Sequence, residues 1–426
     1  MIKRRGNKVN PSHKPADLNV IVKRYIQNLT DQNPRQRSQA AYELGELHAV
    51  EAVSALITAL QEDVNTYVRS SAAEALGHIG AAEAIFPLMD ALRDSSSFVR
   101  RAAAISLGQM QAKQAQMALI HTLDDQNFYV RRAAINAIGK LGIADLGTML
   151  LPYLQHDDAR IQRTTITALR RLRTQEAIPD LVALLQTYQA MPNPHDLPMV
   201  KSLVIALGDL RAPEAVPTLI QVLRGYVGAR SLAANALGQI GDPQAGAALC
   251  EALADKSAGL RLAALKSLGK LNYADAAPQL QKFLTHPDPR LRRVAARASG
   301  DMRHVAAIPQ LLEMVEQDSS PLVRPAAVEA LGKIGDTTVL PRLLPLVNDT
   351  NAYLRAALAY SLHALGNGSG AAQKALRQLA KDPVEHVAMA AKRAQAMECT
   401  DLLPLPASQE PAKKPTSWLQ RLLRRD

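Results

Sequence analysis

The stretch YVRSSAAEALGHIG, residues 67–80, decides the fold, because close variants of it recur along the 426-residue chain about every 31 residues. The glycine at its eleventh position marks the period, and Arg170 takes the place of one missing glycine. Self-similarity at this period predicts a stack of repeated units, since one unit cannot bury its apolar face without its neighbours. The marker glycines are Gly45, Gly77, Gly108, Gly139, Gly208, Gly238, Gly269, Gly300 and Gly332.

Each unit is predicted to contain two antiparallel helices joined by a short turn. In the first helix Val68 and Ala72 lie on one apolar face, and in the second helix of the preceding unit Val53, Leu56 and Leu60 recur at helical spacing. Alanine and leucine dominate the repeats, and both favour helix. The sequence therefore predicts an all-α, right-handed α-solenoid of about eleven to twelve two-helix repeats.

Two features recur with the period and have structural interpretations. The marker glycine lies inside a helix, where glycine costs about 1 kcal/mol relative to alanine, so its recurrence predicts close approach of a neighbouring helix. An arginine recurs eight residues before it. These arginines could form a ladder for anionic ligands, but the shared period favours bonds to a carboxylate or carbonyl at each turn between repeats. They are Arg37, Arg69, Arg100, Arg131, Arg230, Arg261, Arg292, Arg324 and Arg355.

Residues 67–80, LRLAALKSLGKLN (260–272) and EAVPTLIQVLRGY (214–226) carry a family resemblance. They resemble HEAT-like repeats of the phycobilisome-lyase type, in which VRxxAAxALGxIG is followed by EAVPxLIxxL. The resemblance covers about residues 34–400 and implies a solenoid whose second helices line the concave face and whose first helices line the convex face. The same repeat serves many unrelated tasks, so fold does not assign function here.

Charge divides the chain into four expected segments. Residues 1–33 form a basic, partly helical segment with seven basic and two acidic residues, and the solenoid at 34–400 has 38 basic against 34 acidic residues. A Pro-rich linker at 401–417 leads to a basic amphipathic segment at 418–426. The chain shows neither a secretory signal nor an apolar stretch that could span a membrane, which predicts a cytoplasmic protein, peripheral at the inner face of the membrane if its tails bind there.

Function is expected where the period breaks. The fifth repeat has a loop insertion at 186–199, where Tyr188 and His195 are candidate partner-binding residues, although a tolerated insertion explains the loop as well. Two arginine groups on first helices are candidate docking patches for an acidic partner or phosphates, or simply solvated faces. They contain Arg160, Arg163, Arg170, Arg171 and Arg173, and Arg290, Arg292, Arg293, Arg297 and Arg303.

The C-terminal segment is a further candidate, for docking to a membrane or a partner. As a helix it would place apolar residues on one face and basic residues on the other, although nine residues form only a marginal helix alone. The basic N-terminal segment could add a second weak contact with an anionic surface. The residues concerned are Trp418, Leu419, Arg421, Leu422, Leu423, Arg424 and Arg425.

The sequence shows no catalytic constellation and predicts no cofactor or metal site. Cys250 and Cys399 have no partners at metal-ligand spacing, and the histidines are scattered singly. The chain has no His-Glu dipeptide, which deoxyhypusine hydroxylases of similar repeat architecture use for their iron site. The phycobilin lyases also resemble this array, but they offer no compact motif that can be placed on particular residues.

These observations favour a non-enzymatic scaffold or adaptor that binds an unidentified protein partner and is recruited to an anionic surface by its basic tails. Two alternatives stay open. One is a phycobilin-lyase-like protein that attaches or detaches a bilin. The other is a nucleic-acid-binding array, which the near-neutral body and the aromatic content of 4% disfavour.

Overall fold

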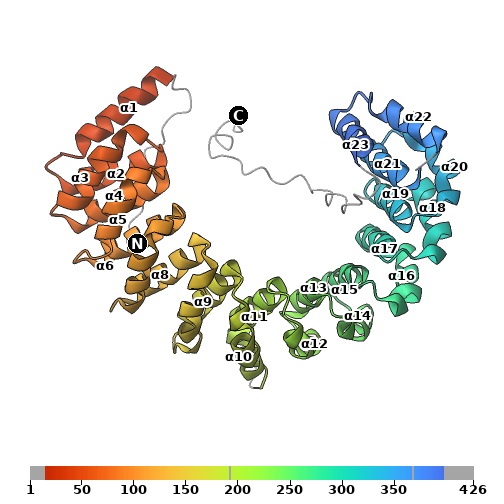
Figure 1. Ribbon diagram of the computed structural model, residues 1–426, viewed down its shortest axis with the longest axis horizontal. Helices are drawn as coiled ribbons and strands as arrows, with labels where there is room; N and C mark the ends of the chain where they lie inside the picture. The colour runs from red at the N-terminus through yellow and green to blue at the C-terminus, as the bar shows by residue number, and fades with distance from the viewer. Residues whose placement is uncertain (1–14, 191–192, 367–368, 398–426) are drawn as a thin grey trace. The chain divides into compact units, whose positions relative to one another are not determined.

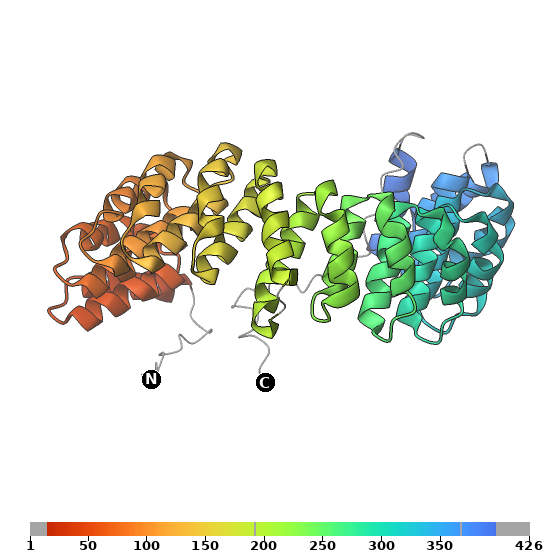
Figure 2. The ribbon, with the colours of Figure 1, turned by 90° about the horizontal axis from the view of Figure 1, so that it is seen from below.

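The structure, a computed structural model, describes residues 15–190, 193–366 and 369–397, and all regular structure in these ranges is helical (Figure 1). It divides into two compact units, and among the described residues unit 1 ends at Ala177 and unit 2 begins at Ile178. Within each unit the helices stand side by side, with their axes across the stacking direction (Figure 2). The predicted all-α solenoid is confirmed, with twelve first helices in the described part of the chain.

Unit 1 begins with α1 (Pro15–Asn28), which precedes the first repeat. Its first helices are α2 (Pro34–Glu46), α4 (Thr66–Ile79), α6 (Ser97–Gln109), α8 (Phe128–Leu141) and α9 (Ala159–Leu172). Its second helices are shorter: α3 (Val53–Glu62), α5 (Ile85–Ala91) and α7 (Gln116–His121), with the 3₁₀ segments η4 (Thr122–Asp124) after α7 and η6 (Thr148–Gln155) in the place of a fourth.

Unit 2 continues the alternation. Its first helices are α11 (Leu197–Asp209), α13 (Arg230–Ile240), α15 (Ala258–Leu271), α17 (Pro289–Asp301), α19 (Val323–Ile334), α21 (Ala352–Leu365) and α23 (Glu385–Ala396). Its second helices are α10 (Ile178–Ala190), α12 (Val216–Gly225), α14 (Gly246–Ala252), α16 (Ala277–Leu284), α18 (Ile308–Gln317), α20 (Leu340–Leu343) and α22 (Gly370–Leu379).

Short 3₁₀ turns join the two helices of most repeats, and the residue that ends the first helix often has a left-handed backbone. Glycine takes this position at Gly80, Gly142, Gly241 and Gly335, with φ between 70° and 85°, a backbone conformation that glycine adopts without a Cβ penalty. The turns are η1 (Val50–Ala52), η2 (Ala82–Ala84), η3 (Lys113–Ala115), η5 (Ala144–Leu146), η7 (Gln175–Ala177), η9 (Pro213–Ala215), η10 (Pro243–Ala245), η11 (Ala274–Ala276), η12 (Val305–Ala307) and η13 (Thr337–Val339); η8 (Pro194–Asp196) and η14 (Leu344–Asn348) are additional.

The marker glycines allow adjacent first helices to approach closely, as predicted. A Cβ added to Gly139 would lie 2.7 Å from the Cα of Ala168 on the next first helix. At Gly77 the neighbour is Ser106, whose buried hydroxyl donates a hydrogen bond to the Ala73 carbonyl at 2.8 Å. Small residues on both sides of each contact thus bring the backbones of the first helices together.

The concave side of unit 2 is lined by first helices, so the expectation that second helices line it is wrong there. Within unit 2, α13, α15, α17, α19 and α21 follow the inner side of the bend, and α12, α14, α16, α18 and α20 the outer side (Figure 1). The reason is steric. First helices pack on one another through Gly, Ala and Ser, whereas adjacent second helices scarcely touch, so the stack is shorter along its first-helix side.

The recurring arginines bind the turns between repeats, which confirms the structural interpretation. Arg69 reaches across the repeat with Nε and Nη2, which donate to the Asp94 carboxylate at 2.8 and 2.9 Å, while its Nη1 donates to the Asp63 carbonyl at 2.9 Å. Asp94 also accepts the Ser96 N–H at 2.7 Å. The equivalent pairs, here called the Asp–Arg ladder, are Arg37–Asp63, Arg69–Asp94, Arg100–Asp125, Arg230–Asp255, Arg292–Asp318, Arg324–Asp349 and Arg355–Asp382.

Two positions of the ladder hold histidine instead of aspartate. His156 and His286 each accept the backbone N–H two residues later, at 2.9 and 3.0 Å, as the ladder aspartates do. Neither supplies a carboxylate for the arginine of its repeat, and among the described residues Arg131 and Arg261 donate to backbone carbonyls alone. The buried Nε of Arg261 has no hydrogen-bond partner among the described residues.

Candidate functional site

The first predicted arginine group lies on and at the end of α9, and some of its members bind neighbouring side chains. Arg160 pairs with Asp158 at 2.7 Å, and this bond is the main reason that the pKa of Asp158 falls to about 2. Arg171 donates to the Asn136 side chain at 2.9 Å. Arg170 lies in the last helical turn, and Arg173 ends the helix with a left-handed backbone (φ 58°). The group therefore does not act as one cluster of five cations.

A row of exposed aromatic side chains runs along the starts of α4, α6 and α8. Tyr67, Phe98 and Tyr129 occupy equivalent positions in three consecutive repeats and are 66%, 56% and 49% exposed. The Tyr67 and Phe98 rings lie 6.2 Å apart. The next equivalent position, on α9, is Arg160. Large apolar side chains exposed in a contiguous row are typical of an interaction surface.

Arginine side chains accompany this row. The Arg160 guanidinium lies 4.3 Å from the centre of the Phe128 ring, and the Arg132 guanidinium lies 5.7 Å from the ring centres of both Phe128 and Tyr129. Such cation–π contacts fix the guanidinium groups against the aromatic row. They join residues of α8 and α9 into one surface.

A second row of arginines lies one helical turn further along the same helices. Arg101 and Arg132 follow Phe98 and Tyr129 by three residues, and Arg163 follows Arg160 by three, which places each of them on the same helix face as the residue that it follows. Arg101 and Arg163 are exposed, and no carboxylate pairs with any of the three within the described ranges. The parts of the two rows on α6, α8 and α9, together with Phe128 and Arg160, are here called the Arg–aromatic patch: Phe98, Arg101, Phe128, Tyr129, Arg132, Arg160 and Arg163.

Of this patch, the sequence predicted only Arg160 and Arg163. The signal for the others was present, because Phe98 and Tyr129, like Arg101 and Arg132, are spaced by one repeat period. Counting aromatic residues over the whole chain conceals such a row, since the low total says nothing about their alignment.

Charge is segregated within unit 1. Its first helices α2, α4, α6, α8 and α9 carry twelve basic and three acidic residues, whereas its second-helix segments between Val50 and Gln155 carry one basic and six acidic residues. The near-neutral total therefore hides a basic first-helix side. The acidic second-helix residues are Glu51, Glu62, Glu83, Asp90, Asp124 and Asp145.

The second predicted arginine group, on α17, is largely neutralised. Arg290 pairs with Asp288 at 2.9 Å, Arg292 belongs to the Asp–Arg ladder, and Arg297 pairs with Glu329 at 3.2 Å. Arg293 has a buried Nε without a hydrogen-bond partner in the described part, and Arg303 ends the segment with φ 48°. The equivalents of Arg293 in the adjacent repeats are Leu262 and Pro325, so no row of cations forms here.

The loop insertion is anchored to the following repeat at both sides. It lengthens α10 and adds η8, and the Tyr226 hydroxyl donates to the Asn193 carbonyl at 3.2 Å while Gln189 donates to the Thr218 carbonyl at 3.1 Å. Burial, followed by the nearby Asp196, raises the pKa of Tyr188. His195 is exposed. The loop thus has a structural attachment, and its role in recognition remains a prediction.

The predicted docking segment at 418–426, with Trp418, Leu419, Arg421, Leu422, Leu423, Arg424 and Arg425, lies outside the described residues. The basic residues before Pro15 do so as well, and membrane recruitment by the two tails stays a prediction. Within the described part, no helix combines the length and apolarity that crossing a bilayer requires.

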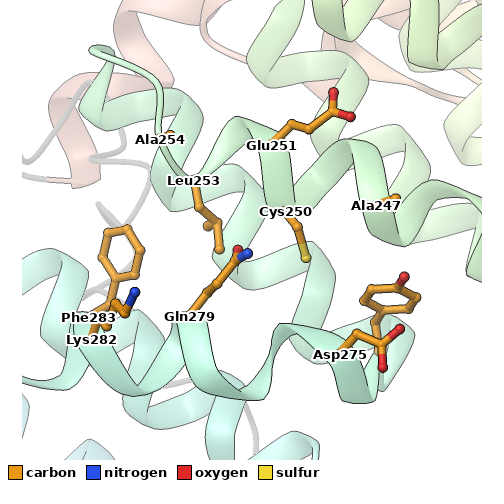
Figure 3. A pocket seen from close by; sticks show the side chains of 10 residues that line it. Ala247, Cys250, Glu251, Leu253, Ala254, Asp275, Gln279, Lys282 and Phe283 are labelled. Atoms are coloured by element: carbon orange, nitrogen blue, oxygen red, sulfur yellow. The ribbon is translucent and has the colours of Figure 1, made fainter.

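A shallow pocket of about 630 Å³ lies between α14 and α16 in unit 2 (Figure 3). Cys250 extends from α14 toward α16, while Gln279, Lys282 and Phe283 come from α16. Burial, with smaller contributions from Asp275 and Glu251, raises the pKa of the Cys250 thiol. A protonated thiol is a weak nucleophile, so this pocket does not present an activated cysteine.

Comparison with known proteins gives matches to a repeat family and to solved structures. A family model described as HEAT repeats matches residues 22–108, 87–147, 117–191, 147–225, 198–261, 226–288, 247–324 and 278–363. No curated protein matches the chain.

Among solved structures, a chain of the Kap95:Nup1 complex is 13% identical over 92% of this chain and 63% of its own length, with a TM-score of 0.65. This likeness shows the solenoid fold alone. A chain from the complex of CpcE and CpcF of phycocyanin lyase from Nostoc sp. PCC7120 is 24% identical over 71% of this chain and 97% of its own length. Its TM-score of 0.37 is too low to support an argument.

Proposed function

Because this chain belongs to the HEAT-repeat family, we propose that it is a non-enzymatic scaffold or adaptor that binds a protein partner along its first helices. The observation that carries the proposal is the Arg–aromatic patch, in which Arg101, Arg132 and Arg163 have no carboxylate partner among the described residues beside the exposed rings of Phe98 and Tyr129. Unpaired cations beside exposed rings contribute little to folding, so binding accounts for them better.

The patch lies on the first-helix side of unit 1. A solenoid suits this role because its surface is preformed, so little conformational entropy is lost in ordering that surface when a partner binds. We include in the proposal a cytoplasmic location and recruitment to an anionic surface through residues 1–33 and 401–426, which carry net charges of +5 and +2. This last step rests on charge alone.

Co-purification from the native cell tests the proposal. The full chain is compared with the triple variant Arg101→Gln, Arg132→Gln, Arg163→Gln, and with chains that lack 188–197 or 401–426. We expect one stoichiometric protein partner on the full chain and its loss from the triple variant. A control variant removes three positive charges elsewhere, as Lys266→Gln, Arg290→Gln, Arg303→Gln, and should retain the partner.

Each competing result is distinct. Failure of the full chain and every truncated form to retain a stoichiometric partner would refute the scaffold. Retention that is equal in the triple variant and the control would refute the patch as its docking surface. Visible absorbance after mixing with a bilin would instead support bilin handling, and absence of phycobiliproteins in the source organism would exclude that alternative.

A further inference from the structure

We infer that the Arg–aromatic patch recognises an acidic, proline-rich peptide segment of the partner, bound as a polyproline-II helix. The inference rests on the proposed function and names the chemistry of its ligand. It follows from three properties of the patch: the charge that it leaves uncompensated, the type of apolar surface beside that charge, and the spacing between its rows.

Charge requires an anionic ligand. Arg101, Arg132 and Arg163 lie on consecutive first helices and have no carboxylate partners within the described ranges, whereas the ladder arginine of α6, Arg100, is bound by Asp125. Guanidinium groups donate to carboxylates through paired N–H groups, and such charge-assisted bonds are stronger than neutral ones. Three anionic groups, one for each repeat, would complete this row.

The aromatic row favours proline beside those anionic groups. Aromatic-lined grooves are the common docking surface for proline-rich segments, because the polyproline-II conformation is preformed and little entropy is lost on binding. Phe98 and Tyr129 are exposed and lie one helical turn from Arg101 and Arg132. A peptide that lies over both rows would therefore place apolar rings on one row and carboxylates on the other.

Spacing fits this conformation. Packed helices lie about 8–10 Å apart. A polyproline-II helix has three residues per turn and rises about 3.1 Å per residue, so every third residue points in the same direction at intervals of about 9 Å. Glutamates spaced by three residues can thus meet the arginines of α6, α8 and α9 in order.

Single-stranded nucleic acid fits the patch less well, although it is also anionic. Non-specific binding of single strands depends on stacking of bases on open ring faces. The Phe128 ring is covered by the Arg160 guanidinium at 4.3 Å. The second-helix segments of the same unit are acidic and would repel a long polyanion.

Fluorescence anisotropy with the full chain tests the inference. The probe is a labelled peptide of four Glu-Pro-Pro repeats; the control peptides are four Gln-Pro-Pro repeats, which keep the conformation without charge, and four Glu-Gly-Gly repeats, which keep the charge without the conformation. We expect the first peptide to bind at least tenfold more tightly than either control. Arg101→Gln, Arg132→Gln, Arg163→Gln and, separately, Phe98→Ala with Tyr129→Ala should each weaken it at least tenfold.

The matched variant Lys266→Gln, Arg290→Gln, Arg303→Gln should change this affinity by less than twofold, and circular dichroism verifies that every variant is folded. Equal binding of the three peptides would overturn the inference, as would tighter binding of oligo(dT) that depends on the same three arginines. If the native partner is captured through the patch but none of the peptides binds, the inference fails and the proposed function stands. If the peptide binds but no native partner is found, the peptide preference of the patch stands and the proposed function fails.

Discussion

At the residue scale, the first-helix glycines occupy the positions that least tolerate a larger side chain. The first-helix glycines are not conformational requirements, since their backbones are ordinary helix; they are required because another backbone occupies the space of a Cβ. At Gly108 a Cβ would lie 2.7 Å from the Ala137 Cα, which belongs to the rigid backbone of the next helix. Helix propensity alone would favour alanine here, so packing outweighs propensity.

We predict that Gly108→Ala destabilises the protein by about 1–3 kcal/mol, because α6 and α8 must separate to accept the methyl group. Urea denaturation followed by circular dichroism measures the change. The control is Gly225→Ala at the end of α12, where a Cβ would contact nothing within 4 Å and the free energy of unfolding should hold or rise slightly. Equal effects of the two substitutions would contradict the packing argument.

We also predict that His286→Asp stabilises the protein by about 1 kcal/mol. The new carboxylate would keep the turn bond to the Asp288 N–H and add a partner for Arg261, whose buried Nε now has none in the described part. His286→Ala should destabilise, since it removes the turn acceptor and adds nothing. Midpoints of urea unfolding at pH 7 distinguish these outcomes, and stabilisation by both substitutions would refute this account of the turn.

At the scale of elements, the Asp–Arg ladder fixes each repeat to the next. Asp318 accepts two bonds from Arg292, at 2.7 and 2.8 Å, and one from the Ser320 N–H at 2.8 Å. Burial acts to raise the pKa of Asp318, but the Arg292 and Ser320 bonds outweigh burial, so its pKa lies below the ordinary value. A single carboxylate thereby orders the turn and joins α17 to it.

We predict that Asp318→Asn costs about 3 kcal/mol at pH 7, because it leaves the half-buried Arg292 without a countercharge. The pKa of Asp318 is lower in the folded state than in the unfolded state, so its contribution is complete above about pH 5 and is lost as the pH falls through the folded-state value. The stability difference between wild type and variant should therefore shrink on acidification. A difference that is constant from pH 7 to pH 3 would contradict the ladder.

The sequence predicted the ladder, but it did not predict which arginines have a carboxylate partner in the folded protein and which have none among the described residues. The period aligns Arg69 and Arg131, and the difference between them arises from a residue 25 positions later, Asp94 in one case and His156 in the other. Arg290 and Arg297 resemble Arg163 in sequence, yet carboxylates from Asp288 and Glu329 neutralise them only after folding. Pairing across repeats depends on side-chain geometry, which a linear pattern does not contain.

At the scale of the whole molecule, the near-neutral charge of the array conceals the contrast within unit 1 between basic first helices and acidic second-helix segments. The curvature also depends on a difference between the two kinds of helix. The Ala- and Gly-rich first helices pack closely on one another, so the stack bends toward their side. Their composition was visible in the sequence, but which helix row becomes concave follows from packing distances between repeats. The family resemblance gave the fold correctly and this orientation incorrectly.

We predict that the triple variant Arg101→Gln, Arg132→Gln, Arg163→Gln is as stable as the wild type or up to about 1 kcal/mol more stable, because it relieves repulsion between cations that no carboxylate compensates in the described structure. Arg290→Gln with Arg297→Gln, which breaks two ion pairs, should be neutral or destabilising. Thermal unfolding at low and high salt compares them. A large loss of stability in the triple variant would mean that the patch serves folding.

The ladder also has a consequence for how such a chain changes length during evolution. Asp63 and Asp94 occupy identical places: each accepts the arginine of its own repeat, orders the turn after it, and offers its carbonyl to the next arginine. If residues 64–94 were removed, Asp63 would meet Arg100 through the same bonds, and Gly45 would face Ser106 as Gly77 now does. Duplication or loss of a gene segment of this size, between repeats that carry the ladder, therefore preserves the ladder bonds at the new junction, so the number of such repeats can vary without a compensating substitution in the ladder.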